Sequence, residues 1–252
     1  MKPIRFLACA AALIAVAGCN SKQGNEAATG PVKLEQVPPP KGGDWTTVVS
    51  ATPAGGFMMG NPNAKVHLVE YGSLTCPHCQ RFDESGVTPL VNTYVKSGQV
   101  SYEFRNYVRD PIDLAASLIA RCNGPAGFFP LARAFYKDQA NWMAKVQTAP
   151  PAQLEALQNL PPNQIGLATA KVVGFPEWAA MRGLPEAKST QCLTNANEVN
   201  RLVEMNADAT QKYPDFPGTP TFILNDKMVE MPGVTEAQLW PALEGKIREA
   251  LR

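Results

Sequence analysis

The chain has 252 residues, of which 45% are hydrophobic and 18% charged, and its formal net charge at pH 7 is +1. A chain of this length and apolar content can bury one large core or two small ones, which excludes a mini-protein scaffold and a disordered chain. The near-neutral charge, without a long basic run, argues against nucleic acid as the main partner. The six cysteines are too few for a dense disulfide scaffold, so each is interpreted separately.

Residues 1–18 have the pattern of a secretory signal peptide. Lys2 and Arg5 precede an apolar run over residues 6–17, which is too short to span a bilayer as a stable helix. The chain is therefore expected to be exported. The run leads into Val-Ala-Gly-Cys at residues 16–19, which resembles a bacterial lipobox and implies lipidation of Cys19. An ordinary signal peptide or an uncleaved anchor with a chance cysteine is the alternative.

Residues 19–44 are rich in glycine and proline and lack helical or strand periodicity. We interpret them as a flexible, lipid-anchored tether in front of a folded domain. Asn20, rather than an aspartate, follows Cys19, and in the resemblance to Gram-negative lipoproteins this favours the outer membrane. The expected location is the bacterial cell envelope, with the domain facing the periplasm.

Two parts of the remaining chain have strand patterns. Within residues 45–109, the segments 65–71 and 100–108 are β-rich, and a helix-compatible stretch to about Lys96 lies between them, which indicates a βαβ unit. Residues 215–252 contain two short strands around the turn Asn225-Asp226, followed by a helix over 235–251. We expect these two parts to form the halves of one sheet domain.

Residues 110–214 contain almost no β-run and are rich in Ala, Leu and Gln, which predicts an inserted helical domain. Its first helix is well marked, because Asp110 is a good N-cap, Pro111 suits the first helical position, and apolar residues follow at helical spacing. Asn-Gly-Pro at 123–125 is the predicted stop. Further helices are predicted over residues 129–139, 151–158, 164–173, 177–181 and 186–212.

The sequence Thr75-Cys76-Pro77-His78-Cys79 places a cysteine where a strand ends and a helix begins. The reactive form of a thiol is the thiolate, and the helix dipole would stabilise it on Cys76 and lower its pKa. Pro77 suits the first helical turn, and His78 can add a donor or a positive charge near the sulfur. Stabilising the reduced thiolate makes the corresponding disulfide more oxidising. Cys79, one turn on, is the predicted partner in that disulfide and the more buried, resolving thiol.

A C-x-x-C spacing also occurs in zinc sites, and Cys76, Cys79, Cys122 and Cys192 could in principle form one. The Pro-His insert between a strand and a helix argues against a metal knuckle, as does an oxidising compartment. We therefore predict no metal site, and nothing in the motif requires a cofactor.

Two motifs carry a resemblance to a known family. The CPHC sequence at residues 76–79 is identical to the active-site motif of the DsbA family of thiol:disulfide oxidoreductases, and GTPTF at 218–222 resembles that family's cis-proline loop. The resemblance covers residues 45–252 and implies an α/β, thioredoxin-like fold with an inserted α-helical domain. It also implies a cis bond before Pro220, next to the Cys76 sulfur, and pairing of the Thr219 backbone with an extended substrate segment.

Glu70 corresponds to an acidic residue that lies buried beneath the disulfide in DsbA-type enzymes. A carboxyl there would have a raised pKa and could relay the proton of Cys79, whereas the alternative is a solvated charge at the end of a strand. Asp83 and Glu84 are predicted to be surface charges, and His67 an ordinary packed or edge residue.

Cys122 and Cys192 form the second cysteine pair of the mature chain. Cys122 ends the first inserted helix and Cys192 lies within the last one, so a disulfide between them would staple the helical domain internally. Two buried free thiols, or a second redox pair, are the alternatives.

We expect a thiol:disulfide oxidoreductase that donates the Cys76–Cys79 disulfide to exported, cysteine-containing proteins and is reoxidised by a membrane partner such as a quinone-linked oxidase. Many DsbA-type oxidases have a hydrophobic residue where Thr219 stands. A disulfide reductase or isomerase, kept reduced by a membrane thiol reductase, therefore remains an alternative. A copper or haem-assembly binding module that uses the two thiols as soft ligands is another.

Overall fold

The computed structural model describes residues 34–252, apart from the side chains at positions 158, 162 and 163. The predicted signal peptide, the lipidation site Cys19 and the predicted tether up to residue 33 lie outside the described residues. Among residues 34–252, no helix is long and apolar enough to cross a membrane.

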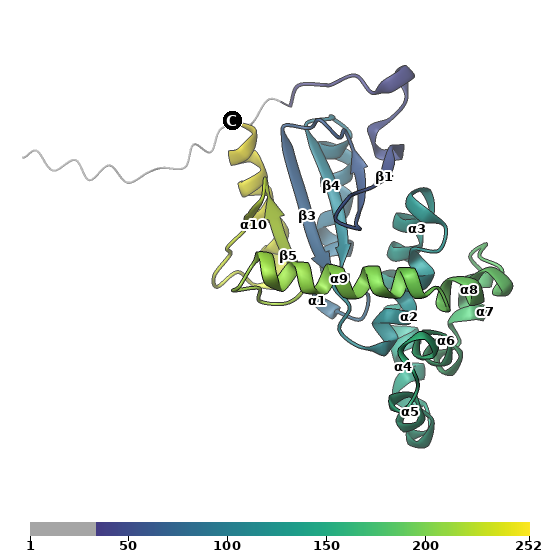
Figure 1. Ribbon diagram of the computed structural model, residues 1–252. Coiled ribbons are helices and arrows are strands. Elements are labelled where there is room, and N and C mark those ends of the chain that lie inside the picture. The colour runs from purple at the N-terminus through teal and green to yellow at the C-terminus, as the bar shows by residue number, and fades with distance from the viewer. Residues whose placement is uncertain (1–33) are drawn as a thin grey trace, which may run out of the picture. The chain divides into compact units, whose positions relative to one another are not determined.

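A six-stranded sheet forms the centre of the described chain, with the strand order β1-β2-β4-β3-β5-β6 (Figure 1). The central pair, β3 and β4, is parallel, and all other neighbouring strands are antiparallel. The strands are β1 (Val49–Ala51), β2 (Phe57–Gly60), β3 (Val66–Gly72), β4 (Val100–Asn106), β5 (Thr221–Leu224) and β6 (Lys227–Met228). The sheet thus joins strands from both of the segments in which the sequence predicts them.

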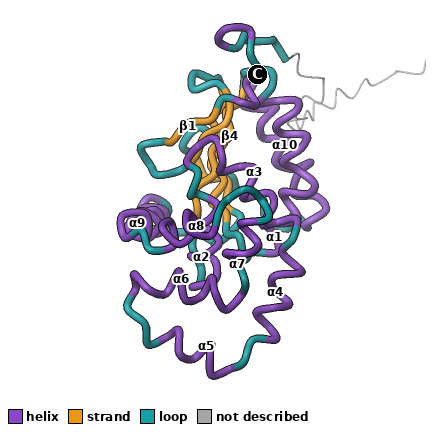
Figure 2. Tube along the Cα trace, turned by 90° about the vertical axis from the view of Figure 1, so that its right-hand side faces the viewer, coloured by secondary structure: helices purple, strands orange, loops and turns teal. Residues whose placement is uncertain are grey.

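Helices cover both faces of the sheet, and this explains the apolar character of β3. Successive side chains of a strand point to opposite faces. Val69 and Tyr71 pack with Ala209 of α9 (Ala196–Lys212) on one face. Leu68 belongs to the main core, together with Ile247 of α10 (Glu236–Leu251), on the other face. Figure 2 shows the strands lying between α9 and α10.

The predicted helix between β3 and β4 is present as three consecutive helical segments. They are α1 (Pro77–Phe82), followed by two π-type segments, η3 (Asp83–Val87) and η4 (Leu90–Val95). Cys76 is the N-cap residue of α1, and Pro77 is its first residue. The end of the central strand therefore leads directly into the helix that carries the cysteine motif.

Between β4 and β5, the residues that the structure describes form eight helices and no strand, so the expected α/β fold with an inserted helical domain is confirmed. The inserted helices are α2 (Pro111–Ala120), α3 (Gly124–Lys137), α4 (Gln139–Thr148), α5 (Pro151–Gln158), α6 (Pro162–Val173), α7 (Phe175–Ala180), α8 (Glu186–Leu193) and α9 (Ala196–Lys212). α9 leads back from the insertion across the face of the sheet (Figure 1).

Three helix predictions differ from the structure. The helix predicted over 129–139 begins earlier, at Gly124, so Asn-Gly-Pro at 123–125, the predicted stop of the preceding helix, is also the start of α3. The single helix predicted over 186–212 is two helices, α8 and α9, because the Asn195 side chain accepts hydrogen bonds from the backbone N–H groups of Asn197 and Glu198 and so caps a new helix. The sequence also contains no recognised signal for α4, which follows α3 after Asp138 alone.

The segment before β3 contains two strands that the sequence does not predict. β1 has three residues, and β2 reads Phe-Met-Met-Gly, which lacks the alternation typical of a strand. Gly56, just before β2, allows the chain to approach β4, because a Cβ atom there would lie 2.5 Å from Oε1 of Glu103. β2 is held by pairing with β4, and β1 by pairing with β2, rather than by their own sequence pattern.

The sequence predicts a flexible tether up to residue 44, whereas the last part of that segment is held against the domain. The Val37 N–H donates to the Ser97 carbonyl oxygen at 2.8 Å, and the Gln99 side chain donates to the Glu35 carbonyl oxygen at 2.7 Å. The buried Trp45 indole donates to the Val37 carbonyl oxygen at 2.7 Å. The folded domain therefore begins before Trp45.

Candidate active site

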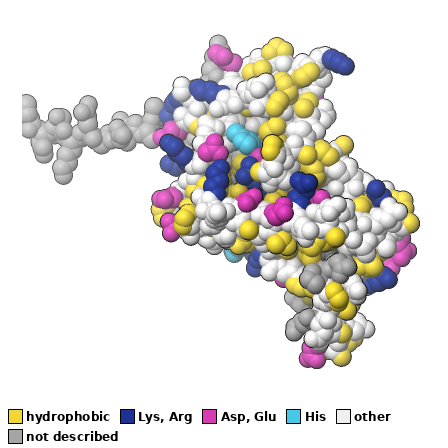
Figure 3. Space-filling model, viewed as in Figure 1, with side chains coloured by type: hydrophobic (Ala, Val, Ile, Leu, Met, Phe, Trp, Pro, Cys, Tyr) yellow, Lys and Arg dark blue, Asp and Glu magenta, His cyan; other side chains and the backbone are white. Residues whose placement is uncertain are grey.

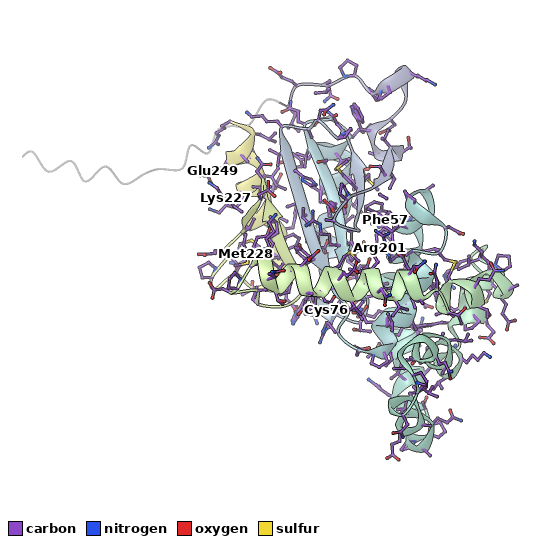
Figure 4. All side chains as sticks on the ribbon, viewed as in Figure 1. Phe57, Cys76, Arg201, Lys227, Met228 and Glu249 are labelled. Atoms are coloured by element: carbon purple, nitrogen blue, oxygen red, sulfur yellow. A yellow bond between two sulfur atoms is a disulfide. The ribbon has the colours of Figure 1, made fainter. Side chains whose placement is uncertain are left out.

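Cys76 lies at the end of the sheet beside the inserted helices, where β3 gives way to α1 (Figure 4). Cys76 and Cys79 are unbonded and both are buried, with 1% and 0% of their surface exposed. Their exposed surface hardly differs, but the Cys79 sulfur lies deeper among protein atoms than the Cys76 sulfur, as the sequence predicts. Their hydrogen bonds and neighbouring charges differ as well.

The pKa of Cys76 is lowered from its ordinary value of 9.0 to about 5. The largest cause is a hydrogen bond from the Cys79 side chain to the sulfur, and burial opposes it. The Thr219 side chain and the backbone N–H groups of Cys79 and His78 also stabilise the thiolate. These N–H groups belong to the first turn of α1, where N–H groups have no partner within the helix, so the N-terminal position acts as the sequence predicts.

The pKa of Cys79 is raised well above 9.0, mainly because the sulfur is buried. The hydrogen bond to Cys76 and the nearby carboxyl of Glu70 raise it further, while the backbone of Ser73 donates a hydrogen bond that opposes the rise. At neutral pH the pair therefore consists of a Cys76 thiolate that accepts a hydrogen bond from a protonated Cys79.

Glu70 lies on the central strand and is buried, with 1% of its surface exposed, so it is not the solvated strand-end charge. Burial raises the pKa of its carboxyl to about 8, against a hydrogen bond from Tyr102 at 2.5 Å that lowers it. Glu70 is thus protonated at neutral pH. The carboxyl of Glu70 raises the pKa of the Cys79 thiol, so the two groups interact electrostatically.

Asp83 corrects a prediction, because it is buried rather than a surface charge. Burial raises the pKa of Asp83 to about 6, although Arg133, 3.4 Å away, favours the charged form. Glu84 is exposed, as predicted. A helix with a polar run such as Asp-Glu-Ser gives no sequence signal for which of its charges faces inward, and here the π-type turn begins at Asp83.

The His78 side chain does not take the position expected for it. The sequence predicts that it adds a donor or a charge near the Cys76 sulfur, whereas its imidazole contacts the carboxylate of Glu236, which also pairs with Arg81. Only the backbone N–H of His78 is among the groups that lower the pKa of Cys76. Glu236 is the first residue of α10, so the exposed side of the motif is tied to the last helix.

The peptide bond between Thr219 and Pro220 is cis. This turn lies directly against Cys76, since the Sγ atom is 3.3 Å from the Thr219 carbonyl oxygen and donates a hydrogen bond to it when the thiol is protonated. Two motifs that are 143 residues apart in the sequence are therefore in direct contact.

Cys122 and Cys192 are joined by a disulfide with a Cα–Cα distance of 5.5 Å. The bond connects the residues that follow α2 to α8, within the helical insertion. Since these sulfurs are bonded to each other, they are not available as ligands to complete a zinc site with Cys76 and Cys79. Within residues 34–252 there is no group of three or more His, Cys, Asp or Glu side chains that could hold a metal ion.

Several polar residues at this site were not predicted from the sequence. Asp113, in the first turn of α2, and Gln139, the first residue of α4, are buried and donate to or accept from the segment Ser73–Cys76. An acidic residue in the first turn of a helix ordinarily stabilises that helix end, so Asp113 carries no separate sequence signal.

Comparisons with known proteins agree with this geometry. The family model described as "Thioredoxin" matches residues 52–242. A curated relative from Rickettsia prowazekii, named "Putative protein-disulfide oxidoreductase", is 26% identical over 175 residues, which are 69% of this chain and 56% of the relative. The chain thus spans little more than half the length of the curated relatives it matches.

Solved structures are similar over a larger share. The crystal structure of a protein-disulfide isomerase from Novosphingobium aromaticivorans is 32% identical, with a TM-score of 0.70, over 77% of this chain and 96% of that one. The structure of α-DsbA1 from Wolbachia pipientis is 18% identical, with a TM-score of 0.58, over 80% of this chain and 94% of that one. The second likeness concerns the fold alone.

Proposed function

Because the chain belongs to the thioredoxin family and has the thioredoxin-like fold with helical insertion found in DsbA proteins, we propose that it is a thiol:disulfide oxidoreductase whose redox pair is Cys76 and Cys79. The observation that carries this proposal is the opposite direction of the two pKa changes, about 5 for Cys76 and well above 9.0 for Cys79. Such a pair has one stable thiolate, and stabilising the reduced form makes the disulfide a stronger oxidant. We therefore assign the oxidase direction.

In the proposed reaction, a substrate thiolate attacks the Cys76 sulfur of the Cys76–Cys79 disulfide. A substrate–Cys76 bond forms, the bond to Cys79 breaks, and Cys79 departs as a thiolate. A second substrate thiolate then attacks the substrate sulfur of this mixed disulfide and releases Cys76 as its stable thiolate. Two electrons pass from the substrate to the cysteine pair, and the substrate leaves with a disulfide.

Glu70 is the proposed proton donor to the departing Cys79. A thiolate with a high pKa is a poor leaving group unless it gains a proton. With a pKa of about 8, Glu70 is protonated at pH 7 and can supply that proton, then recover it when Cys79 is deprotonated again. This role is supported by burial of both groups and by the electrostatic effect of the Glu70 carboxyl on the pKa of Cys79.

The proposed substrates are exported proteins that contain cysteines. Thr219 and Pro220 lie beside the Cys76 sulfur, and the backbone there can pair with an extended segment as an added strand. Main-chain pairing tolerates many sequences. Figure 3 shows basic and acidic side chains interspersed over the α9 face, which fits recognition by backbone and sulfur rather than by an extended region of one charge.

We further propose that the protein works in the bacterial cell envelope, facing the periplasm, with Cys19 lipidated and the anchor in the outer membrane. The signal-like pattern of residues 1–18 supports export. A membrane protein, either a quinone-linked oxidase or a thiol reductase, would then restore the working redox state of Cys76 and Cys79. Labelling of cells with radioactive palmitate tests the anchor, since a Cys19→Ser variant should lose the label.

A disulfide isomerase is the second candidate, and two observations favour it. One similar crystal structure is named a protein-disulfide isomerase, and Thr219 stands where many DsbA-type oxidases have a hydrophobic residue. Alkylation of the thiols in intact cells separates the two directions. An oxidase should be recovered with Cys76 and Cys79 bonded, whereas an isomerase or reductase should be recovered with both thiols free.

A Cys79→Ala variant tests the exchange reaction itself. Without Cys79, a mixed disulfide between Cys76 and a substrate cannot be resolved from the enzyme side, so covalent complexes should accumulate and disappear on reduction. The Cys76→Ala variant is the matched control and should trap nothing. If the Cys79→Ala variant also traps nothing, thiol–disulfide exchange is contradicted and the copper or haem-assembly binding module gains support.

A further inference from the structure

A buried carboxylate of the helical insertion holds the segment that precedes the nucleophile. Asp113 is fully buried, with 0% of its surface exposed, and lies in the first turn of α2. Its Oδ2 atom accepts a hydrogen bond from the Ser73 hydroxyl at 2.6 Å, and its Oδ1 atom accepts one from the Leu74 N–H at 2.9 Å. Its remaining donors are the Arg109 N–H at 3.1 Å and the Ser117 hydroxyl at 3.4 Å.

The segment Ser73–Thr75 connects directly to both sulfurs. The Cys76 N–H donates to the Ser73 carbonyl oxygen at 3.1 Å, which fixes the turn that sets Cys76 at the start of α1. The backbone of Ser73 also donates a hydrogen bond that lowers the pKa of Cys79. A displacement of Ser73 would therefore change the surroundings of both thiols.

Other groups of the insertion hold the same segment. The Gln139 side chain donates to the carbonyl oxygens of Leu74 at 2.9 Å and of Cys76 at 3.2 Å. The Tyr136 hydroxyl donates to the Ser73 carbonyl oxygen at 3.1 Å. Asp110, the N-cap of α2, accepts from the Thr75 hydroxyl at 3.0 Å. Four inserted side chains thus bind every residue from Ser73 to Cys76.

This arrangement differs from an ordinary helix cap. An acidic residue at the third helical position normally reaches back to the N-cap backbone of its own helix. Asp113 instead accepts two of its four hydrogen bonds from Ser73 and Leu74, which are 40 and 39 residues away in the sequence. A carboxylate buried without a charged partner is costly. Burial accordingly raises the pKa of Asp113 to about 7, against the hydrogen bonds from Ser73, Arg109 and Leu74 that favour its charged form.

We propose that Asp113 is a positioning residue for the redox reaction: through Ser73 and Leu74 it holds the Cys76 sulfur against the first turn of α1, so that the helical insertion sets the reactivity of the thiolate. The inference rests on the proposed function, in which Cys76 is the nucleophile. The helical insertion then tunes the reactivity of Cys76 in addition to packing against the sheet.

The test compares the Cys76 pKa of reduced wild-type protein with that of three variants, by thiolate absorbance and by the pH dependence of alkylation. Asp113→Asn retains the shape of the side chain but cannot accept from all the donors around it. Ser73→Ala removes a single hydrogen bond to Asp113 and is the milder variant. Ser117→Ala is the matched control, because Ser117 contacts Asp113 from within α2 and not from the Ser73–Thr75 segment.

The expected result is a rise of the Cys76 pKa by about one unit in Asp113→Asn, which makes alkylation below pH 5 about tenfold slower. Ser73→Ala should raise the pKa by a smaller amount, and Ser117→Ala should leave it unchanged. Circular dichroism and thermal unfolding establish that each variant is folded. If Asp113→Asn does not fold, Ser73→Ala decides the question.

Two outcomes would overturn the inference. Folded Ser73→Ala and Asp113→Asn proteins with the wild-type Cys76 pKa would show that Asp113 is only structural. A lower pKa would show that the hydrogen bonds of Asp113 do not hold the sulfur where its thiolate is stabilised. Failure of the proposed function is distinguishable, since the wild-type Cys76 pKa itself would then lie near the ordinary 9.0.

Discussion

Cys76 and Cys79 lie one helical turn apart, yet their surroundings move their pKa values in opposite directions. Cys76 accepts hydrogen bonds from Cys79, from Thr219 and from the first N–H groups of α1. Burial of the Cys79 sulfur is the largest cause of its raised pKa, and the carboxyl of Glu70 raises it further. Hydrogen bonding at the start of the helix and deeper burial of Cys79 therefore distinguish the proposed nucleophile from the proposed resolving thiol.

At the residue scale, Glu70→Gln should change how stability depends on pH. The pKa of Glu70 is 4.5 in an ordinary setting and about 8 when buried, so between these values the folded protein binds a proton that the unfolded chain does not. Stability of the wild type should therefore fall as pH rises from 4.5 to 8, by at most about 1.4 kcal/mol per pH unit from this group. The variant lacks this contribution.

Denaturant unfolding of the oxidised proteins at pH 5 and pH 9 measures the difference, since oxidised thiols do not titrate. Glu70→Gln should gain stability relative to the wild type between the two pH values. Because Asp83 and Asp113, whose pKa values are about 6 and about 7, titrate in both proteins, only the difference between them is informative. An equal pH dependence for both would show that Glu70 is ionised and solvated when folded.

At the element scale, the disulfide between Cys122 and Cys192 should stabilise the insertion without taking part in the redox reaction. It closes a loop between residues 70 apart. The loss of chain entropy predicts a contribution of up to about 4 kcal/mol, less whatever strain and residual structure remove. Replacing both cysteines with serine should lower the free energy of unfolding and leave the Cys76–Cys79 reduction potential unchanged.

The double serine variant also decides between the staple and a second redox pair. Unfolding in guanidinium chloride gives the stability, and equilibration with glutathione gives the potential. A loss of substrate oxidation in a variant that is still folded would contradict the structural role.

The segment before β1 makes a second prediction at this scale. Trp45→Phe keeps most of the buried ring but removes the indole N–H that donates to Val37, a loss of about 1 kcal/mol. Limited proteolysis should then cut residues 34–44 faster than in the wild type. Trp142→Phe is a suitable control, because it removes a comparable bond, to the Phe135 carbonyl oxygen, inside the insertion. Equal cleavage rates in the two variants would show that Trp45 does not hold this segment.

At the scale of the whole molecule, the sequence predicts the architecture because its strongest signals are local. β3 is rich in β-forming residues, and α2 begins at a good N-cap followed by proline. β1 and β2 escape prediction because they are short and are formed by pairing, β2 with β4 and β1 with β2, which no local pattern records. The break between α8 and α9 at Asn195 is also missed, because helical periodicity continues on both sides of this N-cap residue.

The residues of the candidate site also fall into those that local motifs predict and those that depend on packing. Cys76, Cys79, Pro220 and Glu70 belong to motifs or to a resemblance, and the structure brings them together. Asp113 and Gln139 come from another part of the chain and act through backbone groups, so their position depends on how the insertion packs against the sheet. The inward position of Asp83 and the outward contact of His78 depend equally on packing.

The reduction potential of the Cys76–Cys79 pair tests the central claim most directly. Equilibration of the purified protein with defined ratios of reduced and oxidised glutathione, followed by alkylation of free thiols, measures it. Because Cys76 is a stable thiolate and Cys79 a protonated donor in the reduced form, we predict a potential well above that of thioredoxin, which is about −270 mV, and nearer to that of DsbA at about −120 mV. A value as low as that of thioredoxin would contradict the assignment as an oxidase.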